Sequence, residues 1–95
     1  FIHVLTPCPS GWKFPTDQTI QIAKLAAKCG MWLQFEREDG KITINQKPTN
    51  FDLIPEYLGK QKRFNRIDDE IRERIIAEAK SRYETLQRLA ELNCL

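Results

Sequence analysis

The first apolar run of the chain ends at a proline-rich loop. Residues 1–5 are apolar except for His3, and Pro7 and Pro9 follow closely. Proline has no backbone donor and fixes φ, so it ends the hydrogen bonding of a strand. We therefore predict a strand over Phe1–Leu5 that runs into a rigid loop. Because polar residues do not alternate in it, we expect an interior or near-interior parallel strand that is covered on both faces.

A helix is predicted after this loop. Apolar residues recur at helical spacing between residues 20 and 27, with lysines on the other side. Thr16 or Asp17 can cap the amino end. Gly30 provides a left-handed stop, so the helix is expected over about 16–29.

Two alternating runs then flank the dipeptide Asp39-Gly40. This pair favours a two-residue type I′ turn, in which both residues have positive φ. The turn predicts a β-hairpin with four cross-strand pairs: Phe35 with Ile44, Glu36 with Thr43, Arg37 with Ile42, and Glu38 with Lys41. One face of the hairpin is then mostly apolar and the other mostly charged.

The last third of the chain predicts helix. A short amphipathic stretch, Asp52–Leu58, precedes a basic segment that consists of Lys60, Lys62, Arg63 and Arg66. From Asp68 to about Leu92, one apolar stripe at helical spacing contains Ile71, Ile75, Ala79, Tyr83 and Leu86. A helix of about 25 residues is about 37 Å long. This exceeds what a small core covers, so we expect the helix to pack on another subunit or another part of a complex.

Composition limits the function classes. The chain has 95 residues, 41% of them hydrophobic, and a net charge of +2. These values predict one small domain and exclude a disordered or strongly basic nucleic-acid-binding class. No apolar run approaches the ~20 residues that span a bilayer, and no signal-peptide pattern is present. Three widely spaced cysteines suit a reducing compartment, so we expect a cytoplasmic protein with neither nucleic-acid nor membrane partners.

Cys8 is the residue most suited to chemistry. It lies in the run Pro7-Cys8-Pro9-Ser10-Gly11-Trp12, where prolines stiffen the loop on both sides. A fixed, accessible thiolate can ligate a metal or cluster or act as a nucleophile, although such turns also serve as plain connectors. Cys29 is expected in the core and Cys94 near the terminus, so this chain alone cannot provide four thiolates. No catalytic residue is predicted: His3 is expected to be a strand residue, and the aromatic residues Trp12, Phe14 and Trp32 are expected to be packing groups.

The segment from Ile2 to Phe14 resembles the end of the thiamine-diphosphate-binding domain in the β subunit of pyruvate:ferredoxin oxidoreductase, or pyruvate synthase. That family has a hydrophobic strand followed by Pro-Cys-Pro-Ser/Thr-Gly-Trp. Tyr57-Leu58 followed by Gln61 and Arg63-Phe64 resembles its closing Tyr-Leu…Gln-Gly-Arg-Phe. The resemblance covers about residues 1–67. Lys62, where a glycine is usual, and the helix from Asp68 depart from the pattern.

The resemblance implies an α/β fold. It would be the C-terminal piece of a thiamine-diphosphate-binding Rossmann-like domain, with strand-loop-helix, β-hairpin and long C-terminal helix. Residues 1–67 would end that domain, and residues 68–95 would be a helical extension. The start within an apolar run also indicates a piece of a longer protein.

The implied enzyme decarboxylates a 2-oxoacid, such as pyruvate, on thiamine diphosphate with Mg²⁺. It transfers electrons through [4Fe-4S] clusters to ferredoxin and the acyl group to coenzyme A. By the residue match, Cys8 is the fourth ligand of one cluster, whose other ligands lie upstream. Pro9 has no N–H to donate to that sulfur, which removes one influence that raises a cluster potential. The thiamine and magnesium motifs have no counterpart here, so this chain is expected to be inactive alone and to need other subunits.

Two alternatives remain open from the sequence. The basic segment could bind an anionic partner while the terminal helix packs on another chain, which describes a non-catalytic interaction module. Four charges give only a modest, salt-dependent attraction to a polyanion, so a solvated segment is the simpler reading. The chain could also be a structural tail in which Cys8 binds nothing. The 2-oxoacid is not identified, because branched or dicarboxylic substrates are used by related enzymes.

Overall fold

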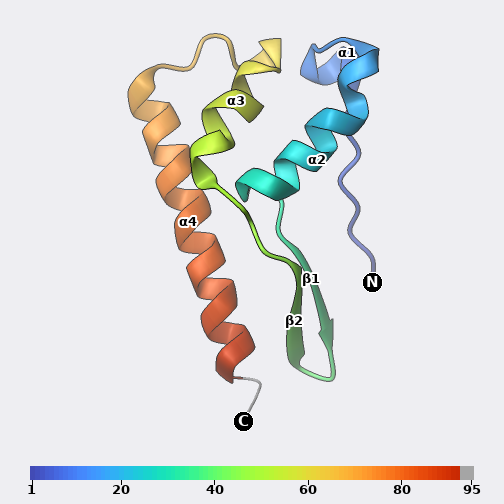
Figure 1. The fold of residues 1–95 in the computed structure, drawn as a ribbon, viewed down its shortest axis with the longest axis vertical. Helices are drawn as coiled ribbons and strands as arrows, with labels where there is room; N and C mark the ends of the chain where they lie inside the picture. Colours follow the sequence, from blue (N-terminus) through green and yellow to red (C-terminus); the bar gives the residue numbers. More distant parts are fainter. Residues whose placement is uncertain (93–95) are drawn as a thin grey trace.

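Two antiparallel strands and several helices make up the computed structural model, which describes residues 1–92 (Figure 1). Its helices and strands are α1 (Pro9–Trp12), α2 (Thr19–Cys29), β1 (Gln34–Glu38), β2 (Lys41–Gln46), α3 (Ile54–Gly59) and α4 (Asp69–Leu92). Short 3₁₀ turns lie at Thr16–Gln18 (η1), Phe51–Leu53 (η2) and Lys62–Phe64 (η3). The mixed α/β content expected from the sequence is confirmed. No helix within residues 1–92 has the length and apolar character needed to cross a membrane.

The helix predicted over residues 16–29 forms as η1 followed by α2. Neither Thr16 nor Asp17 caps α2 with its side chain, so that part of the prediction is wrong. The 3₁₀ turn takes the place of a cap, and the Thr19 hydroxyl donates to the Thr16 carbonyl at 2.8 Å. Gly30 ends α2 in the left-handed region with φ of 89°, as expected.

The hairpin agrees with the prediction in turn and register. Asp39 and Gly40 have φ of 51° and 80°, which is the positive pair that a type I′ turn requires. All four predicted cross-strand pairs are present, and an irregularity lies between Gln34 and Phe35. Ile42 on β2 is buried, whereas every residue of β1 is exposed.

The chain returns from the hairpin to the end of α2. The backbone N–H groups of Thr49 and Asn50 both donate to the Lys28 carbonyl, at 2.8 and 3.2 Å. The Asn50 side chain then accepts from the Asp52 N–H at 2.8 Å and starts η2, which leads into α3. These bonds bring α3 against α2. The buried core that results contains Phe14, Ile22, Ala26, Cys29, Ile54, Tyr57, Leu58 and Ala79.

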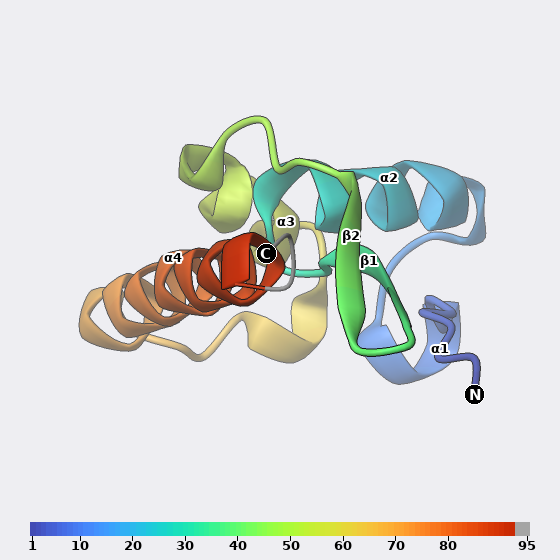
Figure 2. The same cartoon turned by 90° about the horizontal axis from the view of Figure 1, so that it is seen from below.

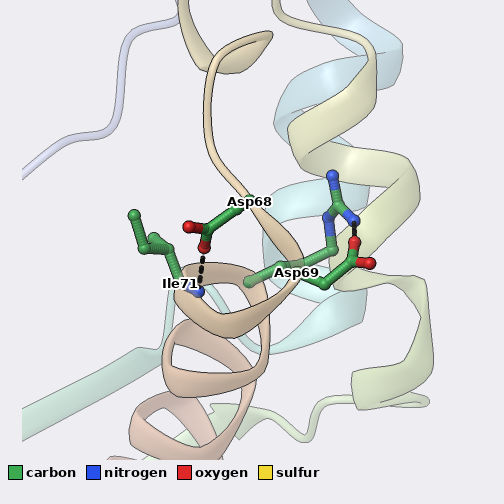
Figure 3. A network of polar contacts seen from close by, with 4 residues as sticks. Asp68, Asp69 and Ile71 are labelled. Carbon is green, nitrogen blue, oxygen red and sulfur yellow. Dashed lines mark hydrogen bonds and ion pairs between the residues drawn. The ribbon is translucent and has the colours of Figure 1, made fainter.

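α4 begins at a side-chain cap. The Asp68 carboxylate accepts from the Ile71 N–H at 2.8 Å, and Asp69 forms an ion pair with Arg72 at 2.7 Å (Figure 3). The acidic first turn also suits the positive end of the helix dipole.

The apolar stripe of α4 packs on this chain. The helix lies beside β2 and η2, as Figure 2 shows from below. Ala79, in the middle of the stripe, is fully buried, and Leu86, its last member, is 7% exposed. The expectation that the stripe packs on another subunit or another part of a complex is therefore wrong for Ala79 and Leu86, because α4 packs on η2 and β2 of this chain. Ile71, at the amino end, is exposed.

Residues 1–8 have no regular secondary structure, so the strand predicted over Phe1–Leu5 is not formed. A strand needs a neighbouring edge, and within residues 1–92 the sheet consists of β1 and β2 alone. Phe1, Ile2 and Val4 are exposed, while His3 meets Trp32 edge-on with ring centroids 4.8 Å apart. The parallel sheet of a Rossmann-like unit is accordingly not seen in the described part of the chain.

Candidate functional site

Cys8 stands directly before α1, the single helical turn near one end of the molecule (Figure 1). Its backbone is extended, with φ of −115° and ψ of 105°, and it is the N-cap residue of the turn. Pro9 occupies the first helical position, where its fixed φ suits a helix and its missing N–H costs no bond. The Cys8 thiol is free and exposed.

Two groups from the same turn contact the Cys8 sulfur. The Gly11 N–H donates to Sγ at 3.4 Å, and the Ser10 hydroxyl lies 3.6 Å from it. These contacts, the Gly11 bond first, lower the pKa of the Cys8 thiol because they favour the thiolate. Pro9 offers no N–H to the sulfur, as expected, but Gly11 of the same turn supplies a backbone donor. An exposed thiolate is the form of cysteine that binds metals.

The turn is closed by backbone bonds and one buried aromatic residue. Trp12 N–H donates to the Cys8 carbonyl at 2.8 Å, and Phe14 N–H donates to the Pro9 carbonyl at 3.1 Å. Lys13 has a positive φ of 59°, which ends α1 after one turn. Phe14 is buried in the core and fixes the carboxyl end of the loop.

The η3 turn lies against α1 although the two are far apart in sequence (Figure 1). The Lys62 N–H donates to the Lys13 carbonyl at 3.0 Å. The Arg63 guanidinium carbon is 4.1 Å from the ring centroid of Trp12 and 4.5 Å from that of Phe64. The two sequence segments that carry the family resemblance are therefore in contact.

Gln61 supports Arg63 from the interior. It is only 1% exposed, and its Nε2 donates to the Tyr57 carbonyl at 3.0 Å. Its Oε1 accepts from Arg63 Nε at 2.9 Å. No local sequence pattern shows that a glutamine between basic residues is buried or that it orients Arg63. The resemblance at Gln61 and Arg63-Phe64 was the one available signal.

Lys62 fits its position without strain. Within residues 1–92 the only non-glycine residues with positive φ are Lys13 and Asp39, so a side chain at position 62 meets no left-handed backbone. The usual glycine of the family is therefore not needed here. Arg63 of the basic segment is exposed, and its guanidinium lies over two aromatic rings.

The other cysteines are not near this site. Cys29 is fully buried, its sulfur lies 3.6 Å from the Ala26 carbonyl, and burial raises the pKa of its thiol. This agrees with the predicted core position. Cys94 lies outside the described residues. Residues 1–92 contain no group of three or more His, Cys, Asp or Glu side chains that could hold a metal ion.

The known proteins that this chain resembles are subunits of two related oxidoreductases. The chain is 45% identical over 67 residues to pyruvate synthase subunit PorB of Methanosarcina barkeri, covering 70% of this chain and 23% of the relative. It is 43% identical over 75 residues to PorB of Methanocaldococcus jannaschii, covering 79% of this chain and 25% of the relative. No protein-family model matches the chain.

A related oxidoreductase subunit matches over a greater length. Ketoisovalerate oxidoreductase subunit VorB of Pyrococcus abyssi is 38% identical over 94 residues, covering 97% of this chain and 30% of the relative. A match of that extent necessarily includes α4, so the helix that departed from the expected pattern has a counterpart in this relative. The chain spans about a quarter of the length of the first relatives it matches. The resemblance found in the sequence is thus confirmed, and this chain belongs with one part of the B subunits of the pyruvate synthase and ketoisovalerate oxidoreductase family.

Proposed function

We propose that this chain is part of a 2-oxoacid:ferredoxin oxidoreductase that acts on pyruvate. The reaction is oxidative decarboxylation to acyl-coenzyme A and CO₂, with electrons passed through a [4Fe-4S] cluster to ferredoxin. The similarity to PorB supports this proposal. The observation that carries it is the exposed Cys8 sulfur, which two hydrogen-bonding groups favour as a thiolate.

Cys8 serves in this proposal as one ligand of the [4Fe-4S] cluster, which accepts and releases single electrons when bound. Iron–sulfur clusters are held by thiolates, and hydrogen bonds to the ligand sulfur tune the potential. Gly11 and Ser10 would provide those bonds. The other three ligands would come from parts of the subunit outside this chain, since Cys29 is buried.

The remaining functions would also lie outside this chain. Thiamine diphosphate and Mg²⁺, which supply the decarboxylation chemistry when bound, would be held by other parts of the enzyme. Residues 1–67 would end a Rossmann-like cofactor domain, and residues 68–95 would be a C-terminal helical extension. The chain would be inactive alone, in a cytoplasmic complex with other subunits, ferredoxin and coenzyme A.

A branched 2-oxoacid is the second candidate substrate. The VorB match includes nearly the whole chain, whereas the PorB matches include 70–79% of it. Ferredoxin-dependent kcat/KM of the complete enzyme for pyruvate and for 2-oxoisovalerate distinguishes the two. A preference for 2-oxoisovalerate would contradict the assignment to pyruvate.

Cys8→Ser in the complete enzyme tests the cluster ligand. We expect less iron and acid-labile sulfide per subunit, or a shifted cluster potential, because a harder oxygen ligand replaces the thiolate. Thiamine diphosphate binding should largely survive. Cys29→Ser is the matched control and should leave iron content unchanged. A Cys8→Ser enzyme with unchanged iron, potential and ferredoxin reduction would show that Cys8 is a plain connector residue.

A further inference from the structure

The contact between Arg63 and Trp12 joins the Cys8 loop to the segment that follows α3. We propose that Arg63 is a positioning residue, which holds α1 against η3 and thereby fixes the Cys8 sulfur. This inference rests on the proposed function, in which Cys8 is a cluster ligand. The contacts that support it are independent of any bound group.

The first support is the stacking of Arg63. Its guanidinium lies 4.1 Å from the centroid of the Trp12 ring and 4.5 Å from that of Phe64. Both distances are within the range of cation–π attraction, and a planar guanidinium covers an aromatic ring as an ammonium group does not. Within residues 1–92, the ion pair that forms is Arg72 with Asp69, so Arg63 has no carboxylate partner there. Its place is explained by stacking rather than by charge pairing.

The second support is the fixed orientation of the guanidinium. Arg63 Nε donates to Gln61 Oε1 at 2.9 Å, and Gln61 Nε2 donates to the Tyr57 carbonyl at 3.0 Å. Gln61 and Tyr57 are both buried. A continuous series of contacts therefore runs from α3 in the core, through Gln61 and Arg63, to the half-buried Trp12 of α1.

The third support is the short length of α1. A single helical turn is not stable in isolation, because the conformational entropy lost in forming the first turn exceeds the stabilisation from its few hydrogen bonds. Its geometry must therefore come from tertiary contacts. Phe14, just after α1, is buried in the core, and Trp12 packs against that core. The contacts to η3 are the Trp12–Arg63 stack and the bond from Lys62 N–H to the Lys13 carbonyl at 3.0 Å.

Loss of this contact would reach the sulfur through the turn itself. Trp12 N–H donates to the Cys8 carbonyl at 2.8 Å, and the same turn places Gly11 N–H 3.4 Å from Sγ. If α1 opens, both bonds break together. The hydrogen bond to the ligand sulfur would then be lost, and such bonds set the reduction potential of a cluster.

The test compares three variants of the complete enzyme: Arg63→Gln, Arg63→Lys and the control Arg66→Gln. Amide hydrogen exchange of residues 11–14 is measured in the iron-free subunit, and the cluster potential is measured in the loaded enzyme. In both Arg63 variants the amides of residues 11–14 should exchange about two- to fivefold faster. This factor corresponds to the free energy of one exposed cation–π contact. Both should also shift the cluster potential. Arg66→Gln removes the same charge from the same segment and should match the wild type in both measurements.

Three results would overturn the inference. The first is unchanged amide exchange in Arg63→Gln. The second is wild-type behaviour of Arg63→Lys, which would show that charge alone matters. The third is faster amide exchange without a change in the cluster potential. If Arg63→Gln does not assemble, Trp12→Phe and Trp12→Leu replace it, and only the leucine variant should accelerate exchange. The exchange measurement needs no cluster. A failure of the cluster proposal, seen as unchanged iron in Cys8→Ser, is therefore distinguishable from a failure of this one.

Discussion

The ring of Phe51 fills the space where a side chain on Gly30 would lie. A Cβ on Gly30 would be 2.3 Å from Phe51 Cε1, and the φ of Gly30 is +89°. This close approach lets η2 pack on the end of α2. The glycine at the helix end is thus required twice, by its backbone conformation and by the aromatic residue that covers it.

Gly30→Ala should destabilise the chain by about 2–4 kcal/mol, since left-handed strain and overpacking both contribute. Urea denaturation measures the change in free energy of unfolding. Gly40→Ala is the control: its φ is +80°, but no atom lies within 4 Å of the added Cβ. It should cost only about 1–2 kcal/mol. Equal losses for the two variants would contradict the role given to Phe51.

Asp68→Ala should cost about 1 kcal/mol of unfolding free energy, because the variant loses the side-chain cap of α4. Asp69→Ala breaks the exposed ion pair with Arg72 and should cost about 0.5 kcal/mol or less. Thermal unfolding followed at 222 nm compares the two. The cap assignment is wrong if Asp69→Ala proves the more harmful change.

Leu86→Ala should destabilise the chain by about 2–3 kcal/mol, because Leu86 is 7% exposed and its removal leaves a cavity beneath α4. Leu89, one turn on, is 44% exposed, and Leu89→Ala should change stability by about 0.5 kcal/mol or less. Chemical denaturation of both variants tests whether the helix packs on this chain. If both variants lose little unfolding free energy, the stripe of α4 contacts another subunit instead.

Alkylation of the iron-free protein should separate the two described cysteines by pH. The pKa of Cys8 is lowered, chiefly by the Gly11 N–H, so its thiolate forms below the ordinary thiol pKa. The pKa of Cys29 is raised by burial, so its thiolate forms above that value. Peptide mapping after iodoacetamide treatment should therefore find Cys8 modified at lower pH than Cys29. Ser10→Ala, which removes the second contact, should raise the pH midpoint for Cys8.

The pKa shifts of Cys8 and Cys29 change folding stability with pH in opposite directions. The lowered pKa of Cys8 adds stability that is present above the ordinary thiol pKa and is lost as the pH falls through the lowered value. The raised pKa of Cys29 adds stability that is present below the ordinary value and is lost as the pH rises through the raised one. In Cys29→Ser, the decline in stability at alkaline pH should therefore be smaller than in the wild type. An unchanged alkaline profile would contradict the burial of Cys29.

Local patterns predicted the parts of the fold that depend on local rules. Asp39-Gly40 fixed the turn, and the turn fixed every cross-strand pair. Gly30 ended α2 where expected. The strand over Phe1–Leu5 was not formed, because a strand depends on a neighbour that sequence spacing does not supply.

The candidate site could likewise be predicted only where it depends on residues that are adjacent in sequence. The proline-flanked Cys8 could be singled out because the prolines and the sulfur are adjacent in sequence. Arg63 and Trp12 could not be paired, since their contact depends on how η3 returns to α1. The direction in which α4 packs was also misjudged, because its partner surface is built by β2 and η2 after folding.

The exposed outer edge of β1 has a consequence for self-association. Gln34–Glu38 has one strand neighbour within residues 1–92, which leaves the backbone groups of its other edge open to a strand from another molecule. Glu36, Arg37 and Glu38 are consecutive charges on this edge strand, and pairing with a second copy would strip them of water and, where Arg37 faces Arg37, would bring like charges together. The charged strand can therefore keep an open hairpin from polymerising, although Phe35 on the same strand is exposed.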